Sequence, residues 1–131
     1  MSRHDTSHSA LGARARAVLD VIYRFGEISG PDLMRELPAL PSYSALRSIL
    51  RALEGKGLIR HRMDGPRYVF RPTMPKSQAS RNALRRVLDT YFGGAPEHAL
   101  KALLDVSRDR RRDVDYDSLQ QLIDEARKDG K

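Results

Sequence analysis

The fold of this chain is decided by residues 42–59, which read SYSALRSILRALEGKGLI. Apolar residues recur in this stretch at helical spacing, and they are Leu46, Ile49, Leu50 and Leu53. A polar stripe with the same spacing runs along the opposite side, formed by Ser44, Arg47, Ser48 and Arg51. Ser42 is the expected N-cap, and Gly55 and Gly57 end the helix. The stretch therefore predicts a helix with one core face and one face of hydrogen-bond donors.

A β-hairpin is predicted directly after this helix. Residues 58–62 and 68–71 are short strand-like runs, and an Asp-Gly pair between them, Asp64 and Gly65, signals a tight turn. Tyr68 and Phe70 share one face of their strand, so we expect both rings to pack inward.

Two shorter signals precede the central helix. Residues 13–25 carry apolar side chains at helical spacing, closed by Gly26, and Ser29 is the expected N-cap of a second helix of about two turns. Proline residues at 38 and 41 break that helix. Three helices followed by a hairpin is the order of a winged helix-turn-helix, so we expect a mainly α fold whose N-terminal part is an α+β winged helix-turn-helix. We assign residues 11–73 to it and expect residues 1–10 to be a flexible tail.

Three further helices are predicted after a connector between Pro72 and Pro75. The first of these helices ends near residue 94. The second spans residues 95–107, and the third spans residues 117–128 with Asp115 as its N-cap. A piece of roughly 55 residues buries too little surface alone, so residues 74–131 are expected to form a helical dimerisation region. The expected interface consists of Leu84, Val87, Leu88, Tyr91, Phe92, Leu100, Leu103, Leu104, Leu119, Leu122 and Ile123.

The charge distribution favours a polyanionic partner. The chain has 131 residues, 24 Lys plus Arg against 17 Asp plus Glu, and a net charge of +7. Residues 47–71 carry seven basic and two acidic residues, a net charge of +5, whereas residues 76–131 carry twelve and ten, a net charge of +2. The total charge fits nucleic acid or an acidic membrane surface equally, but its position on a helix and hairpin favours DNA. The run Arg108–Arg112 has acidic neighbours and is interpreted as a solvated loop, with contact to flanking phosphates left open.

Several classes of site have no support in the sequence. The chain has no cysteine, and its four histidines show no metal-ligand spacing, so we expect neither a metal nor a cofactor. No local motif positions a catalytic nucleophile, which argues against an enzyme. Because no apolar run approaches about 20 residues and the first residues are polar, we expect a soluble cytoplasmic protein without a membrane partner.

Double-stranded DNA is the partner that these patterns favour. Short side chains would let the central helix approach the major groove while Arg47 reaches a guanine edge or a phosphate. Tyr43 either binds a phosphate through its hydroxyl or packs against Leu40 as a helix staple. The expected helix contacts are Ser42, Tyr43, Ser44, Ala45, Arg47, Ser48 and Arg51, and the expected wing contacts are Arg60, Arg62 and Arg67. The alternative function is a winged-helix interaction module that binds an acidic protein.

The chain resembles the penicillinase-repressor family of bacterial transcriptional repressors, the BlaI/MecI type with its copper-responsive CopY branch. The resemblance extends from about Leu11 to Ala126. The residues that carry it are 17–22 (AVLDVI), the block 42–59, 67–72 (RYVFRP) and 88–94 (LDTYFGG). It implies a homodimer that occupies a promoter palindrome and blocks transcription in the bacterial cytoplasm.

Two features of that family are missing from this chain. In its best-known members an upstream membrane sensor protease triggers cleavage of the repressor at an Asn-Phe bond. Here the only asparagine is Asn82, followed by Ala83, so the resemblance suggests such a protease while the sequence lacks its cleavage site. The CopY branch uses a C-terminal cysteine hook, which a chain without cysteine cannot form.

Overall fold

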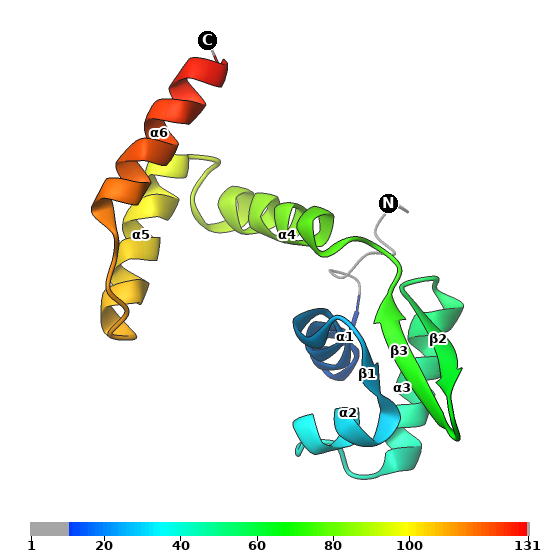
Figure 1. Cartoon of the computed structure of the whole chain (residues 1–131). Helices are drawn as coiled ribbons and strands as arrows, with labels where there is room; N and C mark the ends of the chain where they lie inside the picture. The colour runs from blue at the N-terminus through cyan, green and yellow to red at the C-terminus, as the bar shows by residue number, and fades with distance from the viewer. Residues whose placement is uncertain (1–10, 131) are drawn as a thin grey trace. The chain divides into compact units, whose positions relative to one another are not determined.

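The computed structural model describes residues 11–130, so the expected tail and its histidines lie outside the described residues. The described part forms α1 (Ala13–Phe25), β1 (Ile28–Ser29), α2 (Gly30–Glu36), α3 (Tyr43–Gly55), β2 (Ile59–Asp64), β3 (Arg67–Pro72), α4 (Lys76–Tyr91), α5 (Pro96–Asp109) and α6 (Tyr116–Gly130) (Figure 1). The chain divides into two compact units, Met1–Ser80 and Arg81–Lys131. This division falls inside α4, and the expected domain boundary at residue 74 stays a prediction.

The helices of the first unit begin and end where their capping residues predict. The Ser29 hydroxyl accepts a hydrogen bond from the Asp32 backbone N–H at 3.2 Å, and Ser42 accepts one from Ala45 at 3.1 Å. Both bonds satisfy amide groups that have no partner inside the helix. Gly26 ends α1 with a φ of 80°, a left-handed conformation that glycine adopts without a steric penalty.

A three-stranded antiparallel sheet stands where the sequence predicts only a hairpin. The strand order is β1-β3-β2, and Ile28 and Ser29 of β1 pair with Phe70 and Val69 of β3. A strand of two residues shows no alternation of polar and apolar side chains, which explains why the sequence does not predict β1. The hairpin itself is confirmed, with Gly65 and Pro66 between the paired residues Asp64 and Arg67.

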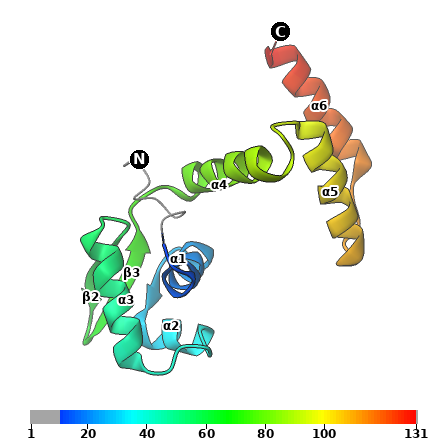
Figure 2. The same cartoon turned by 180° about the vertical axis from the view of Figure 1, so that it is seen from behind.

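One apolar core joins the helices and the sheet of the first unit. The helix α3 lies against one face of the hairpin in both views (Figures 1 and 2). The largest fully buried side chains are Leu19, Ile22, Leu33, Leu46, Leu53, Ile59 and Val18. They come from α1, α2, α3 and β2, so the core face predicted for α3 is confirmed together with the predicted fold class.

The prediction that Tyr68 packs inward with Phe70 is wrong. Phe70 is 7% exposed, whereas Tyr68 is 51% exposed although it lies on the same face of β3. Phe70 pairs with β1 and reaches the core, but Tyr68 pairs only with Met63, nearer the hairpin turn and beyond the last residue that β1 covers. The hairpin extends past the core, and alternation along a strand does not reveal where that core ends.

The second unit is formed by helices with little buried surface. Its apolar residues lie at helical spacing on α4, α5 and α6, yet α5 and α6 contain no buried residue. Local signals still define the ends: the Ser118 backbone N–H donates to Asp115 Oδ1 at 3.0 Å, so the predicted cap of α6 is confirmed. A hydrogen bond from the Ser118 hydroxyl, followed by this backbone hydrogen bond, holds the pKa of Asp115 below its ordinary value.

Candidate nucleic-acid interface

The exposed face of α3 carries the polar side chains that the sequence singles out. Ser44, Arg47, Ser48 and Arg51 are all exposed, and Ala45 is half-buried. Leu46, Leu50 and Leu53 hold the opposite face of the same helix in the core. The two arginines lie one turn apart, and the serines leave little side-chain bulk around them. Such a face can enter a major groove and present two guanidinium groups to base edges or phosphates.

Tyr43 connects the start of α3 with the start of α2. A Cβ atom added to Gly30 would lie 2.5 Å from the Tyr43 hydroxyl oxygen, so a larger residue at position 30 would displace this hydroxyl. The side chain remains 44% exposed. The Tyr43 hydroxyl therefore lies beside Gly30 at the start of α2, while much of the side chain still faces solvent.

A groove of about 310 Å³ separates α3 from the hairpin. Arg47, Arg51 and Glu54 line it from α3, and His61, Tyr68 and Phe70 from the strands; Tyr43 and Leu50 complete the lining. The Nδ1 atom of His61 lies 2.7 and 2.8 Å from the two carboxylate oxygens of Glu54, and its ring meets that of Tyr68 edge to face at 4.9 Å. His61 thus joins the wing to α3.

The three arginines predicted for the wing share one face of the hairpin. Strand alternation puts Arg60, Arg62 and Arg67 with Arg71 on the face opposite His61. They lie at different levels, because Arg67 adjoins the turn whereas Arg60 pairs with Arg71 at the base. Arg67 is thus the predicted wing contact closest to the tip of the hairpin.

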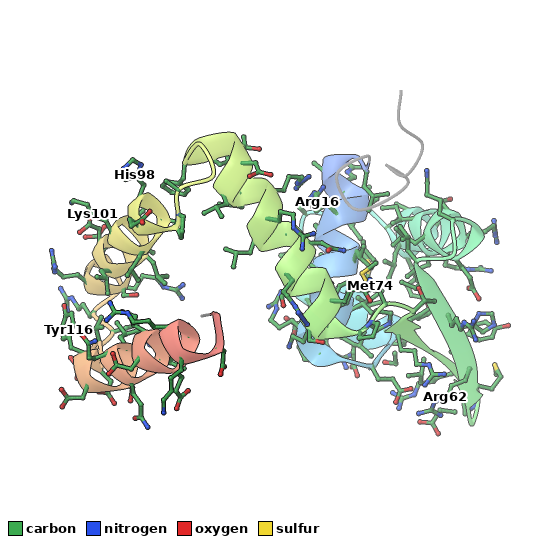
Figure 3. All side chains as sticks on the ribbon, turned by 90° about the horizontal axis from the view of Figure 1, so that it is seen from above. Arg16, Arg62, Met74, His98, Lys101 and Tyr116 are labelled. Atoms are coloured by element: carbon green, nitrogen blue, oxygen red, sulfur yellow. The ribbon has the colours of Figure 1, made fainter. Side chains whose placement is uncertain are left out.

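Arg62 is held by a partner that the sequence does not reveal. Its Nε and Nη2 atoms donate to the two carboxylate oxygens of Glu27 at 2.9 and 3.0 Å. Figure 3 labels Arg62 on the hairpin. These hydrogen bonds hold the pKa of Glu27 below its ordinary value, helped by the charges of Arg62 and Arg71. The residues are 35 positions apart, and no local pattern connects them.

The residues predicted for a dimer interface lie on helices whose apolar sides are open, except Phe92, which follows the end of α4. Tyr91 is 74% exposed, and Leu84, Leu122 and Leu103 are between 57% and 61% exposed. Val87, Leu100 and Ile123 are also exposed, while Leu88, Phe92, Leu104 and Leu119 are half-buried. Val106 and Tyr116, which the prediction omits, are exposed as well, and the spacing of Val106 from Leu103 is a helical signal that would have included it.

Metal sites and membrane spans are absent from the part of the chain that the structure describes. Among residues 11–130, no three His, Cys, Asp or Glu side chains gather closely enough to hold a metal ion. Within the same range, no helix is both long enough and apolar enough to cross a bilayer.

Three helices, a three-stranded sheet and an exposed polar helix face beside a basic hairpin define a winged helix-turn-helix protein. The family model described as "Penicillinase repressor" matches residues 11–125, and the chain belongs to that family, as its resemblance indicates. This is a family of DNA-binding transcriptional repressors rather than of enzymes. Among solved structures, the chain is similar to the "Solution structure of the DNA binding domain of the repressor BlaI", at 22% identity over 54% of this chain and 89% of that one, with a TM-score of 0.48. No curated protein matches the chain.

Proposed function

We propose that this protein is a cytoplasmic, dimeric repressor that reads a palindromic operator with α3 and the wing. The exposed face of α3 is the observation that carries this proposal, because it combines Arg47 and Arg51 with short side chains that let the helix approach base edges. A dimer bound across a promoter prevents transcription by occupying it.

The helix and the wing have different roles in this proposal. Arg47 reads bases, because a guanidinium fork on a guanine edge discriminates against the wrong base by about 1–3 kcal/mol. Arg67, next to the hairpin turn, binds phosphate and adds affinity for any sequence. Arg62 can bind phosphate only after it leaves Glu27, so it contributes less than its charge suggests.

Dimerisation is proposed because the second unit lacks a core of its own. Its three helices expose most of the apolar side chains predicted for the interface. A second copy of the chain would cover these side chains and present two copies of α3 to the same duplex. For a twofold dimer on B-form DNA we expect half-sites about 34 Å apart, or a multiple of that distance.

Release from the operator is proposed to proceed without cleavage at an Asn-Phe bond. Asn82 is the only asparagine in the sequence, and Ala83 follows it. The inducing signal therefore acts on this chain by another route.

Selection of bound fragments from the source genome, followed by measurement of the recovered duplex, tests this function. We expect one palindromic motif, bound with an affinity that falls steeply with salt. Arg47→Ala should lower the preference for the motif over scrambled duplex, whereas the control Arg110→Ala, in the segment between α5 and α6, should leave it unchanged. A selection that recovers no common motif would contradict the proposal and favour an interaction module. Unchanged preference in Arg47→Ala would contradict the role of α3.

A further inference from the structure

A second cleft lies at the base of the hairpin, apart from the face of α3 described above. It has a volume of about 680 Å³. It is surrounded by the end of α1, by Arg60 of β2, by the end of β3 and by the first residue of α4. Its charged lining residues are Arg24, Arg60, Arg71 and Lys76. The segment with Met74, labelled in Figure 3, forms the wall that leads into α4.

The charge of this cleft has one sign. Among the described residues, its lining includes four cationic side chains and no aspartate or glutamate. None of these four side chains forms an ion pair within residues 11–130. The carboxylate that feels the charge of Arg71 belongs to Glu27, and both of its oxygens are already bound by Arg62. Four cations without a counterion among residues 11–130 repel one another, and an anion placed between them removes that repulsion.

The start of α4 adds to the positive potential. The helix begins at Lys76, and its first turn contains no acidic residue. The N-terminal end of a helix carries a partial positive charge, which here adds to that of the four side chains.

Aromatic surface lies beside the cations. Phe25 is 50% exposed, and the Arg24 guanidinium carbon lies 5.8 Å from the centre of its ring. Tyr23 is a half-buried part of the same lining. The volume lies within the range of about 300–1,000 Å³ that is typical of small-molecule sites. The cleft therefore offers anion contacts and a flat apolar surface together.

We propose that this cleft binds a small organic phosphate with an aromatic ring, the chemical class of a nucleotide. The cations would hold the phosphate groups, and Phe25 and Tyr23 would contact the ring. The ligand would join the base of the wing to the first residue of α4. This inference goes beyond the proposed function and does not depend on it.

A free ligand fits the position of the cleft better than the phosphates of the operator do. The pair Arg60–Arg71 is four residue pairs from the pair Asp64–Arg67 at the hairpin turn, a separation of about 13 Å along the strands. The cleft thus lies at the base of the hairpin. The wing is proposed to meet DNA at the opposite end, the tip.

Isothermal titration calorimetry of the full chain with ATP, without DNA or a divalent metal, tests the proposal. We expect ATP to bind saturably, whereas sodium chloride added to the same ionic strength should give no saturable heat. Tripolyphosphate, which lacks the ring, should bind more weakly than ATP. Arg24→Gln and Arg71→Gln should each weaken ATP binding about tenfold, since each removes one charged contact to phosphate. Arg110→Gln removes the same charge elsewhere and should bind ATP like the unaltered protein.

Three outcomes would overturn the inference, provided that circular dichroism shows all variants folded. The first is the absence of saturable ATP binding, and the second is equal weakening in Arg110→Gln, which would indicate a general charge effect. The third is equal affinity for tripolyphosphate and ATP, which would remove the role of the aromatic ring. Titration of Arg71→Gln with operator duplex completes the test. If the unaltered protein does not bind ATP and Arg71→Gln binds the duplex more weakly, the cleft binds phosphates of the operator backbone instead of a free ligand.

Discussion

Replacing Glu27 by glutamine is expected to strengthen the binding of duplex DNA, although Glu27 itself is not a predicted DNA contact. In the free protein its carboxylate accepts hydrogen bonds from Nε and Nη2 of Arg62 at 2.9 and 3.0 Å. A phosphate must compete with this carboxylate for the same donors. Glutamine keeps the size of the side chain but loses its charge, so Arg62 becomes available to the DNA backbone.

The size of the effect follows from how many additional phosphates the dimer binds. Each bound phosphate changes the slope of log affinity against log salt concentration by about −0.9, so two copies of Arg62 in a dimer make the slope steeper by about 1.8. Between about 50 and about 200 mM salt, this adds about tenfold to the loss of affinity. Fluorescence anisotropy with an operator duplex over this range measures both the affinity and the slope.

Arg62→Gln in both backgrounds decides whether the Glu27 pair is responsible. We expect Arg62→Gln to change binding little in the unaltered protein and to cancel the gain in the Glu27→Gln variant. Glu125→Gln on α6 is the matched control, because it removes one negative charge elsewhere. If Arg62→Gln weakened binding equally in both backgrounds, or Glu125→Gln reproduced the gain, the competition between carboxylate and phosphate would be refuted.

Three other measurements test the packing, the interface and the helix cap. Leu53→Ala removes a fully buried core side chain and should lower the free energy of unfolding by about 2–5 kcal/mol in urea denaturation, with normal stability contradicting the observed core. Leu122→Asp places a charge on an exposed apolar side of α6 and should yield monomers in analytical ultracentrifugation, whereas an intact dimer would place the interface elsewhere. Because the pKa of Asp115 is depressed in the folded protein, its ionised carboxylate stabilises the fold at pH values above the ordinary pKa of an aspartate. This stabilisation is lost as the pH falls through the depressed pKa. The stability of Asp115→Asn should accordingly change less than that of the unaltered protein between neutral and acidic pH, and parallel curves would show that the cap does not contribute.

Helix positions were predictable because their signals are local. Ser29 and Ser42 cap the helices that follow them, and the leucines of α3 are buried at the spacing that the sequence shows. Capping bonds join residues three positions apart, and apolar periodicity needs only one helix to be recognised. The hairpin turn is local for the same reason.

The candidate site was predictable only as far as single elements determine it. The exposed face of α3 follows from its own period, but the pairs Arg62–Glu27 and His61–Glu54 join separate elements. The exposure of Tyr68 also depends on the tertiary structure, since it follows from where β1 ends against β3.

The sequence by itself determined the helices, the hairpin and the face of α3 that carries Arg47, because each depends on contacts within a few residues or on the period of one element. Only the tertiary structure decided which cations have a counterion. Folding brings Glu27 to Arg62 across 35 residues, while Arg24, Arg60, Arg71 and Lys76 gather around one cleft. The strength of an electrostatic interaction depends on distance in space, and distance along the chain does not determine it.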